Sequence, residues 1–480
     1  MSDELCELEA TALLALMAAE ATSSVEVMAA HLARIERVNP RLNAIVTLVA
    51  DQALEAARRA DVARRGGGPL GALHGLPVGI KDLVETAGIR TTYGSPIYSD
   101  SVPVEDASIV KRLKAAGAIV VGKTNTPEFG AGSHTFNAVF GATRNPYDDS
   151  RSAGGSSGGA AVALACGMLP LADGTDLGGS LRNPAGFCNV VGLRPSPGRV
   201  TNLPVTDAWD PLSVSGPIAR TVRDIALALD VMSTPDPRAP MSLAGAAESY
   251  QAELDQDITG FRIAWSRDLG GLPLESQVAR VLAPQRAVFE GLGCGVCDAE
   301  PDLSDADEAF DVLRALGFVG NHHEKWLEHR ALLKDTVVWN IEAGLELTPL
   351  RIARAMSLRS AIVQRMMAFF EHFDALVLPV SQVAPFPLEV DWVRDIEGHP
   401  MEHYVAWQRS CSRITVTSHP AISVPAGFTP SGLPVGIQIV GRYRDERRLL
   451  RIAKAFEAAT EHGRRRPVLG SLEPDEAATL

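Results

Sequence analysis

The chain has 480 residues, of which 46% are hydrophobic and 21% charged, a composition typical of a soluble globule with a large core. Its formal net charge of −13 argues against an unspecific surface for nucleic acid or other polyanions. No run of 18 apolar residues occurs, and the acidic N-terminus lacks the basic start and apolar block of a signal peptide. We therefore expect no membrane span and a cytoplasmic protein.

The first quarter of the chain alternates between helical and strand patterns. Apolar residues recur at helical spacing near the N-terminus until Asn39-Pro40, which is a typical stop signal. Four further segments follow, so that the expected order is helix 5–38, helix 50–65, strand 76–80, helix 106–117 and strand 118–121. This alternation favours an α/β layer architecture.

The rest of the chain divides into segments of different composition. Residues 157–168 are small and apolar, which predicts a tightly packed buried helix. Residues 234–260 are polar and rich in Pro and Ala, which suggests a surface excursion. Strand, helix and strand are expected over 261–300, and 305–370 are expected to be mainly helical.

Six cysteines are present, and one pair has the CxxC form. Cys294 and Cys297 stand in a segment that predicts a strand after a helix. No second pair and no histidine cluster accompanies them, so we interpret them as structural or incidental rather than as a zinc or redox site. We expect no metal.

Two serine-containing glycine frames, 154–159 and 174–180, indicate a nucleophile. A hydroxyl that a substrate must approach closely needs small neighbours and unusual backbone angles, and glycine supplies both. The hydroxyl also needs a base, but no histidine lies in or beside either frame. Lys81 stands upstream, in LPVGIKD. The combination favours a Ser–Lys system over a Ser-His-Asp triad.

The chain resembles the amidase signature family from about Leu5 to Pro467. Its blocks follow the family order: GLPVGIKD around Lys81, VGKTNTPEFG at 121–130, GGSSGG to GR at 154–199, GPIARTVRD at 216–224, DALVLPVSQVAPFP at 374–387 and HPAISVPAGFTPSGLPVGIQIVG at 419–441. The resemblance implies one α/β domain over 1–480, a central mixed β-sheet surrounded by helices. Its signature core would span about 70–225.

The resemblance also implies a catalytic triad. Ser180 would be the nucleophile, Ser156 a proton bridge that follows a cis Gly155–Ser156 peptide, and Lys81 the base. Ser157 is the rival for the bridge, but the separation of 24 positions between Ser156 and Ser180 matches the family spacing. Consecutive N–H groups after Asp176 can curl into an anion-binding nest. By resemblance, the oxyanion hole comprises the amides of Leu177, Gly178, Gly179 and Ser180.

The surroundings of the triad carry further expectations. Burial among apolar and glycine residues, away from acids, would lower the pKa of Lys81, with Asp82 on the opposite side of an extended segment. Asp176 and Arg182 would support the nucleophile loop through hydrogen bonds and charge pairing, and Thr175 would stiffen the same turn. Arg194 stands where the family usually has a lysine, which suggests a structural role.

Substrate contacts are less strongly indicated. Gly130, Gly132 and Ser133 align with a family loop that borders the acyl pocket, where small residues leave room. The region 305–370 and residues 404–407 are expected to shape the mouth of the site. Their aromatic residues and histidines could equally be core at helical spacing: Phe310, Phe318, His322, His323, Trp326 and Trp339.

These patterns predict a serine amidohydrolase that cleaves the C–N bond of small amides, and possibly of carbamates, without a cofactor, as a monomer or homodimer. One alternative is the glutamine-hydrolysing subunit of a tRNA-dependent amidotransferase. This chain has EHYVAWQRSCSRITVTSHPA where such subunits have a YxxD-type block followed by an NLAGLPA-like strand entry. The other alternative is a non-catalytic binding protein on the same fold, against which the intact lysine and serines argue.

Overall fold

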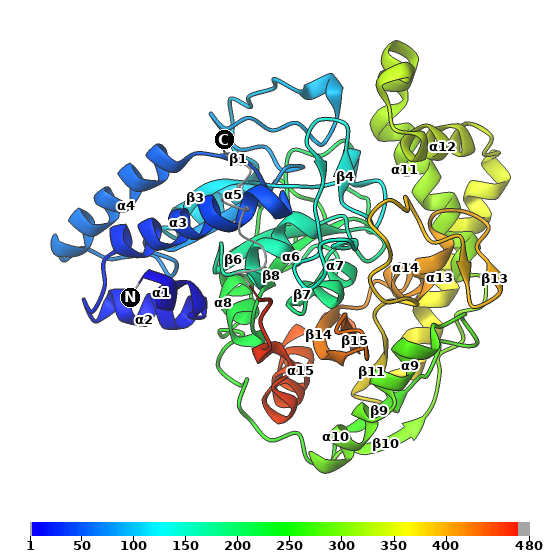
Figure 1. Ribbon diagram of the computed structural model, residues 1–480. Helices are drawn as coiled ribbons and strands as arrows, with labels where there is room; N and C mark the ends of the chain where they lie inside the picture. Colours follow the sequence, from blue (N-terminus) through cyan, green and yellow to red (C-terminus); the bar gives the residue numbers. More distant parts are fainter. Residues whose placement is uncertain (1, 469–480) are drawn as a thin grey trace.

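One mixed β-sheet of eleven strands forms the centre of the computed structural model, which describes residues 2–468 (Figure 1). The strand order is β1-β3-β2-β6-β8-β7-β14-β15-β11-β9-β10. The pair β2–β3 and the pair β2–β6 are parallel, whereas β6–β8, β7–β8, β14–β7 and β14–β15 are antiparallel. The expected α/β fold with a central mixed sheet is confirmed.

The strands of this sheet come from the whole length of the chain. They are β1 (Ile45–Leu48), β2 (Pro77–Lys81), β3 (Ile119–Thr124), β6 (Leu171–Asp176), β7 (Val191–Arg194), β8 (Val214–Ala219), β9 (Arg262–Trp265), β10 (Gly295–Asp298), β11 (Ala375–Pro379), β14 (Ala421–Phe428) and β15 (Pro434–Gly441). Two small hairpins complete the strands: β4 (Phe136–Asn137) with β5 (Gly141–Ala142), and β12 (Asp395–Ile396) with β13 (His399–Pro400).

Fifteen α-helices are found within residues 2–468. They are α1 (Ser2–Glu7), α2 (Ala10–Ala18), α3 (Ser24–Leu42), α4 (Ala50–Arg65), α5 (Ser108–Ala115), α6 (Gly158–Ala165), α7 (Arg182–Phe187), α8 (Val222–Met232), α9 (Ser276–Leu282), α10 (Gln285–Gly291), α11 (Ala306–His329), α12 (Asp335–Leu345), α13 (Pro349–Phe369), α14 (Arg409–Val416) and α15 (Glu446–Thr460). None of them combines the length and apolarity needed to cross a membrane.

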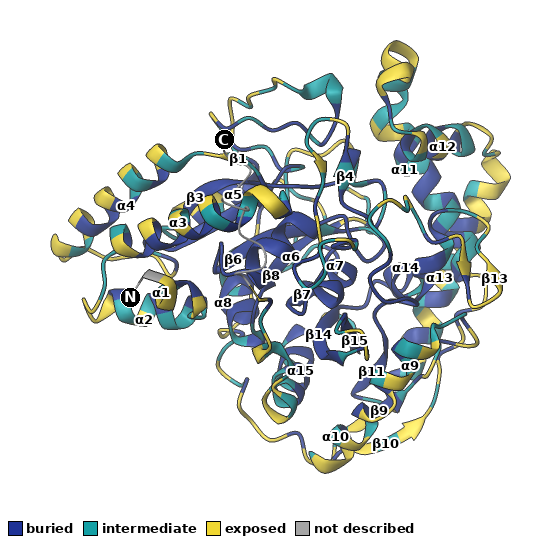
Figure 2. Cartoon of the chain, in the orientation of Figure 1, coloured by how far each residue is buried: buried dark blue, intermediate teal, exposed yellow. Residues whose placement is uncertain are grey.

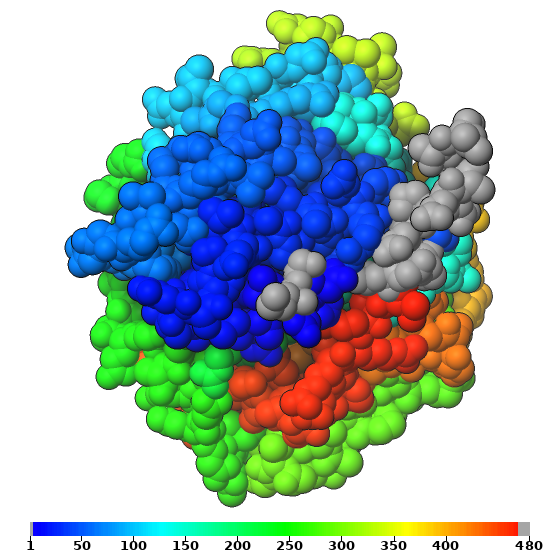
Figure 3. All heavy atoms as spheres, turned by 60° about the vertical axis from the view of Figure 1, so that its left-hand side comes forward, coloured from blue at the N-terminus to red at the C-terminus, as the bar shows by residue number. Residues whose placement is uncertain are grey.

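Two buried apolar clusters flank the sheet. One contains residues of α2, α5, α8, α9 and α15, and the other contains residues of α3, α4, α6 and α7. The central strands are buried on both faces, which explains their continuous apolar runs, whereas the outer helices expose one side (Figure 2). On one face of the molecule, the N-terminal helices lie beside the C-terminal helix α15 (Figure 3).

The N-terminal prediction was wrong in two respects. The expected single helix over 5–38 is three helices, and α3 starts at a capping box formed by Ser23 and Glu26. Pro40 does not stop α3, which runs to Leu42 and ends at Asn43, whose φ is 54°. The other expected elements are found with small shifts at their ends, and α4 has the predicted bounds.

Candidate active site

Lys81 ends strand β2, between β3 and β6, and is completely buried. Its Nζ lies 2.7 Å from Ser156 Oγ and 2.9 Å from Ser157 Oγ. Thr175 Oγ1, on β6, is also 2.9 Å away. Thr175 was expected only to stiffen a turn, but it holds the amine directly. Three hydroxyls therefore surround the buried amino group.

Burial lowers the pKa of Lys81 from 10.5 to about 7, although Asp173 and Asp176 oppose the shift. The expectation that no acid lies nearby was wrong, because Asp173 Oδ1 accepts a 2.6 Å hydrogen bond from the Lys81 backbone N–H. Asp82 does face the other way: its Oδ2 accepts the Thr92 hydroxyl at 2.5 Å. Loss of hydration is nevertheless the largest influence on Lys81, so its neutral form is accessible near pH 7.

The first glycine frame places two serines at the amine. The Gly155–Ser156 peptide is cis, as predicted. The next residue, Ser157, precedes α6, and its N–H donates to the Ser180 carbonyl at 3.2 Å. The two glycine frames therefore touch. The hydrogen bonds of the described residues include Ser156–Lys81 but not the expected Ser156–Ser180 bond. Ser156 and Ser157 both reach the lysine, so both could serve as the bridge.

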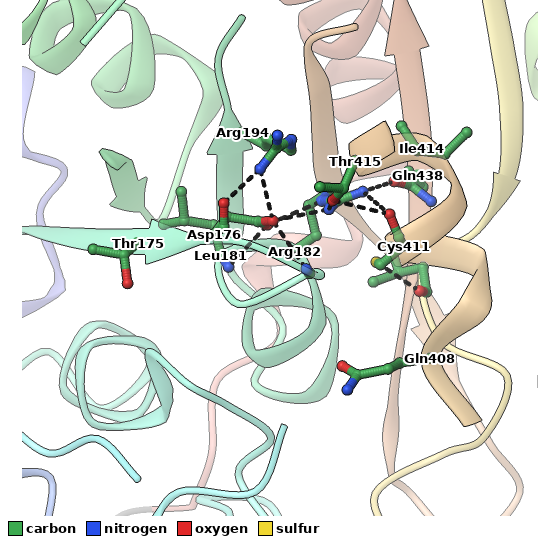
Figure 4. Close-up of polar contacts among 12 residues, drawn as sticks. Thr175, Asp176, Leu181, Arg182, Arg194, Gln408, Cys411, Ile414, Thr415 and Gln438 are labelled. Carbon is green, nitrogen blue, oxygen red and sulfur yellow. Dashed lines mark hydrogen bonds and ion pairs between the residues drawn. The ribbon is translucent and has the colours of Figure 1, made fainter. Parts of the chain in front are cut away.

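Asp176 is the centre of a buried ion network behind the nucleophile loop (Figure 4). Its Oδ1 lies 2.9 Å from Arg182 Nη2 and 3.2 Å from Arg194 Nη1, and all three side chains are fully buried. The two guanidinium groups hold the pKa of Asp176 below its usual range despite burial. Arg182 also ties the loop to the C-terminal part of the chain, through Cys411 O, Thr415 Oγ1 and Gln438 Oε1. The supporting roles expected for Asp176 and Arg182 agree with this geometry.

Close packing explains the glycines of the second frame. Gly179 has a φ of +119°, and its N–H donates to Asp176 Oδ1 at 2.9 Å. That amide is therefore engaged by the carboxylate rather than open as an oxyanion donor. A Cβ on Gly178 would lie 3.0 Å from the Phe310 ring of α11. Helix α11 thus packs directly on the loop that carries Ser180.

A cavity of about 360 Å³ opens beside Ser156 and Ser180. Its inner wall contains Phe129, Gly130, Ser156, Thr175, Leu177 and Ser180.

The described residues contain no group of three His, Cys, Asp or Glu side chains placed to hold a metal ion. Of the CxxC pair, Cys294 is buried and Cys297 exposed, and neither is bonded to another cysteine.

Of the three predicted acyl-pocket residues, only one lines the cavity. Gly130 lines the cavity, and a Cβ there would lie 3.5 Å from Ser156 Oγ. Gly132 and Ser133 are not among the lining residues, because the Ser133 hydroxyl is turned toward Gln408 Oε1. A hydrogen bond across 275 positions of sequence is not visible to a local pattern.

The outer wall was only partly predicted. Within the expected region 305–370, α11 contributes Arg314, Phe318, Asn321 and His322, whereas Trp326 and Trp339 are not among the lining residues. The segment 198–215 supplies many of the other lining residues, and sequence reasoning missed it. Ala239 and Met241, in the expected surface excursion, also reach the cavity. These loops carry no motif, and only the fold brings them to the site.

Comparisons with known proteins identify the family. The amidase family model matches residues 26–450. An acylamidase from Rhodococcus erythropolis is 36% identical over 96% of this chain and 97% of its own length. The A-type subunit of a glutamyl-tRNA(Gln) amidotransferase from Moorella thermoacetica is also 36% identical, over 93% of this chain and 96% of its own. The crystal structure of a bacterial aryl acylamidase has a TM-score of 0.90 at 30% identity, covering 96% of this chain and 99% of that one. The chain therefore belongs to the amidase signature family, whose members hydrolyse amides.

Proposed function

We propose that this protein hydrolyses the C–N bond of small amides through an acyl-enzyme on Ser180, with Ser156 and Lys81 as the proton relay. The observation that carries the proposal is the position of Lys81. Its buried amine, with a pKa lowered to about 7, contacts Ser156 at 2.7 Å, and Ser156 and Ser180 line one cavity. A base that is neutral near pH 7 is what a serine nucleophile needs.

The reaction would proceed in two halves. Ser180 Oγ attacks the carbonyl carbon while its proton passes through Ser156 to neutral Lys81. Backbone amides of the nest stabilise the oxyanion, and those of Leu177, Gly178 and Ser180 are the candidate donors, because the Gly179 N–H donates to Asp176. The relay then protonates the leaving amine as the C–N bond breaks. Water attacks the acyl-enzyme by the same route and releases the carboxylic acid.

The relatives support amides with good leaving amines as substrates, because one is an acylamidase and another an aryl acylamidase. An aryl amine leaves more readily than an alkyl amine, so its expulsion demands less from the proton donor. Carbamates of aromatic amines present the same carbonyl and leaving group, and we include them in the proposed range. Esters present a better leaving group to the same nucleophile.

A second function is favoured by one specific observation, the 36% identity to the amidotransferase protein. Under this alternative the protein would hydrolyse glutamine and depend on partner proteins. Purified protein that turns over anilides alone supports the amidase. Glutamine hydrolysis without anilide turnover supports the alternative.

The test is covalent capture at Ser180. We expect a fluorophosphonate probe to add to the wild-type protein at the peptide that contains Ser180, as mass spectrometry would show. The Ser180→Ala variant should lose the adduct and retain less than about a hundredth of wild-type kcat, because the attacking atom is gone. Ser357→Ala, an exposed serine on α13, is the matched control. A labelled and active Ser180→Ala variant would remove Ser180 from the nucleophile role.

A further inference from the structure

Helix α11 presents one continuous face to the catalytic cavity. Phe310 packs on Gly178 of the nucleophile loop, and Arg314, Phe318 and His322 line the cavity at successive four-residue steps. Four residues advance an α-helix by about 6 Å, so Arg314 follows the nucleophile contact by one turn. A positively charged side chain therefore stands in the wall of the catalytic cavity, one helical turn beyond the contact with the nucleophile loop.

The Arg314 charge has no counter-charge in an ion pair of the described residues. The residue is only 7% exposed, yet none of the ion pairs among residues 2–468 includes it. The acids of the same half of α11 are committed elsewhere: Asp307 to Arg413 at 2.7 Å, Glu308 to Arg354 at 2.8 Å and Asp311 to Arg409 at 2.6 Å. A buried charge without a partner is costly, so this arrangement suggests that a ligand completes it.

Neutral groups hold the guanidinium in one orientation. Arg314 Nε donates to Asn340 Oδ1 at 3.1 Å, and Nη2 donates to the Tyr404 hydroxyl at 2.6 Å. The Asn340 amide also donates to that hydroxyl, which closes a triangle of three buried side chains. The guanidinium carbon lies 4.7 Å from the Phe318 ring centre. An arginine held in this way loses little side-chain freedom when it binds an anion.

Three donor hydrogens of Arg314 remain. A guanidinium carries five N–H groups, and two of them are used by Asn340 and Tyr404. Nη1 makes no hydrogen bond to the described residues, and it is not among the enclosed polar atoms that lack a partner. Because Arg314 lines the cavity, the unused Nη1 side is the part that can face it. Adjacent N–H groups on a planar fork match the two oxygens of a carboxylate.

We propose that Arg314 binds a carboxylate of the substrate, so that the preferred substrates are amides with a carboxylate at a distance from the scissile bond. This inference rests on the proposed amidase function. Glu85, Asp207 and Asp210 also line the cavity, and none of them is in an ion pair of the described residues. An anionic group would be repelled by these acids and attracted to Arg314. Lining residues of opposite charge thus also favour one orientation of the substrate.

The test compares matched substrates that differ only in charge. One pair places the group on the acyl side: N-phenylglutaramate and 5-methylhexananilide, in which an isopropyl group replaces the carboxylate. The other pair places it on the amine side: 4-acetamidobenzoate and 4-isopropylacetanilide. The signal is arylamine release, and the change in the kcat/KM ratio of the carboxylate to the neutral member between wild type and an Arg314 variant isolates the charge, because the leaving amine of each substrate is the same in both proteins.

We expect wild-type protein to favour the carboxylate by tenfold or more in one pair. Arg314→Met should lower that ratio at least tenfold, and Arg314→Lys should retain part of the preference because it keeps the charge. Arg413→Met is the matched control: it removes an arginine bound to α11 that does not line the cavity, and it should leave the ratio unchanged. Thermal unfolding confirms that each variant is folded.

Two results would overturn the inference. One is that wild type shows no carboxylate preference in either pair while it hydrolyses neutral anilides. The other is that Arg314→Met lowers kcat/KM equally for the carboxylate and the neutral substrate. Failure of the proposed function looks different, because no anilide would then be cleaved. In that case calorimetry measures the binding of N-phenylglutaramate to two proteins, the Ser180→Ala variant and the double variant that also carries Arg314→Met. Binding at least tenfold weaker without Arg314 supports the carboxylate site, and equal or absent binding refutes it.

Discussion

The buried Lys81 predicts both a pH profile and a stability profile. With a pKa of about 7, roughly nine in ten molecules hold neutral lysine at pH 8 and about one in ten at pH 6. A lysine of ordinary pKa, 10.5, would be neutral in only about one molecule in 300 at pH 8. We therefore expect kcat/KM to rise about tenfold per pH unit below pH 7 and to level off above pH 8.

The same titration makes folding stability depend on pH. The folded-state pKa of Lys81 lies below the unfolded value, so between about pH 7 and 10.5 the unfolded chain binds more protons and stability rises with pH. Below pH 7 the lysine is charged in both states, and the full cost of burying it is present. A tenfold change in an ionisation constant is worth about 1.4 kcal/mol, so this cost is on the order of 4–5 kcal/mol.

Lys81→Met tests both consequences, because it removes the base and the titration together. Activity should be lost. The difference in the free energy of unfolding, variant minus wild type, should be highest near pH 6.5. It should fall by several kcal/mol by pH 9.5, because wild type gains stability over this range. Urea denaturation at pH 6.5, 8 and 9.5 measures this difference, with the partly exposed Lys111→Met as control.

The reasoning about Lys81 would be refuted by a kcat/KM that is flat from pH 5.5 to 8.5 while chemistry limits the rate, as shown by a dependence on the leaving amine. An apparent pKa near 10 would also refute it. A constant stability difference between Lys81→Met and wild type would mean that the lysine does not titrate below its ordinary range in the folded protein.

Three further outcomes are expected. Asp176→Asn leaves two buried guanidinium groups without a counter-charge and should cost about 3–5 kcal/mol in urea unfolding, whereas Asp255→Asn, at an exposed ion pair, should cost little. Gly179→Ala places a Cβ 2.6 Å from the Cys411 Cβ at a φ of +119° and should lower kcat/KM more than a hundredfold; Gly317→Ala, in open space on α11, should leave it intact. An anilide should give a higher kcat/KM than its matched N-aryl carbamate, whose carbonyl is less electrophilic, and the reverse order in arylamine release would contradict the proposed scope.

The sequence revealed those parts of the site that depend on local backbone demands. Glycine frames and buried apolar strands leave a local pattern, so β2 with Lys81 and the helix after Ser157 could be predicted. The break before α3 also had a local signal, the Ser23–Glu26 capping box, which the apolar periodicity concealed. The segment 198–215 and the Arg314 triangle had none, because their partners lie far away in sequence and only the fold brings them together.

The charges near Lys81 explain how a lysine with two acids nearby can still have a lowered pKa. Asp176 is the more strongly ionised of the two, but Arg182 and Arg194 balance its charge. Burial raises the pKa of Asp173. Both acids favour the protonated amine, but the loss of hydration is the larger influence on Lys81 and prevails. The arginines behind the nucleophile loop thus hold the loop in place and also balance part of the Asp176 charge, which favours the protonated form of Lys81.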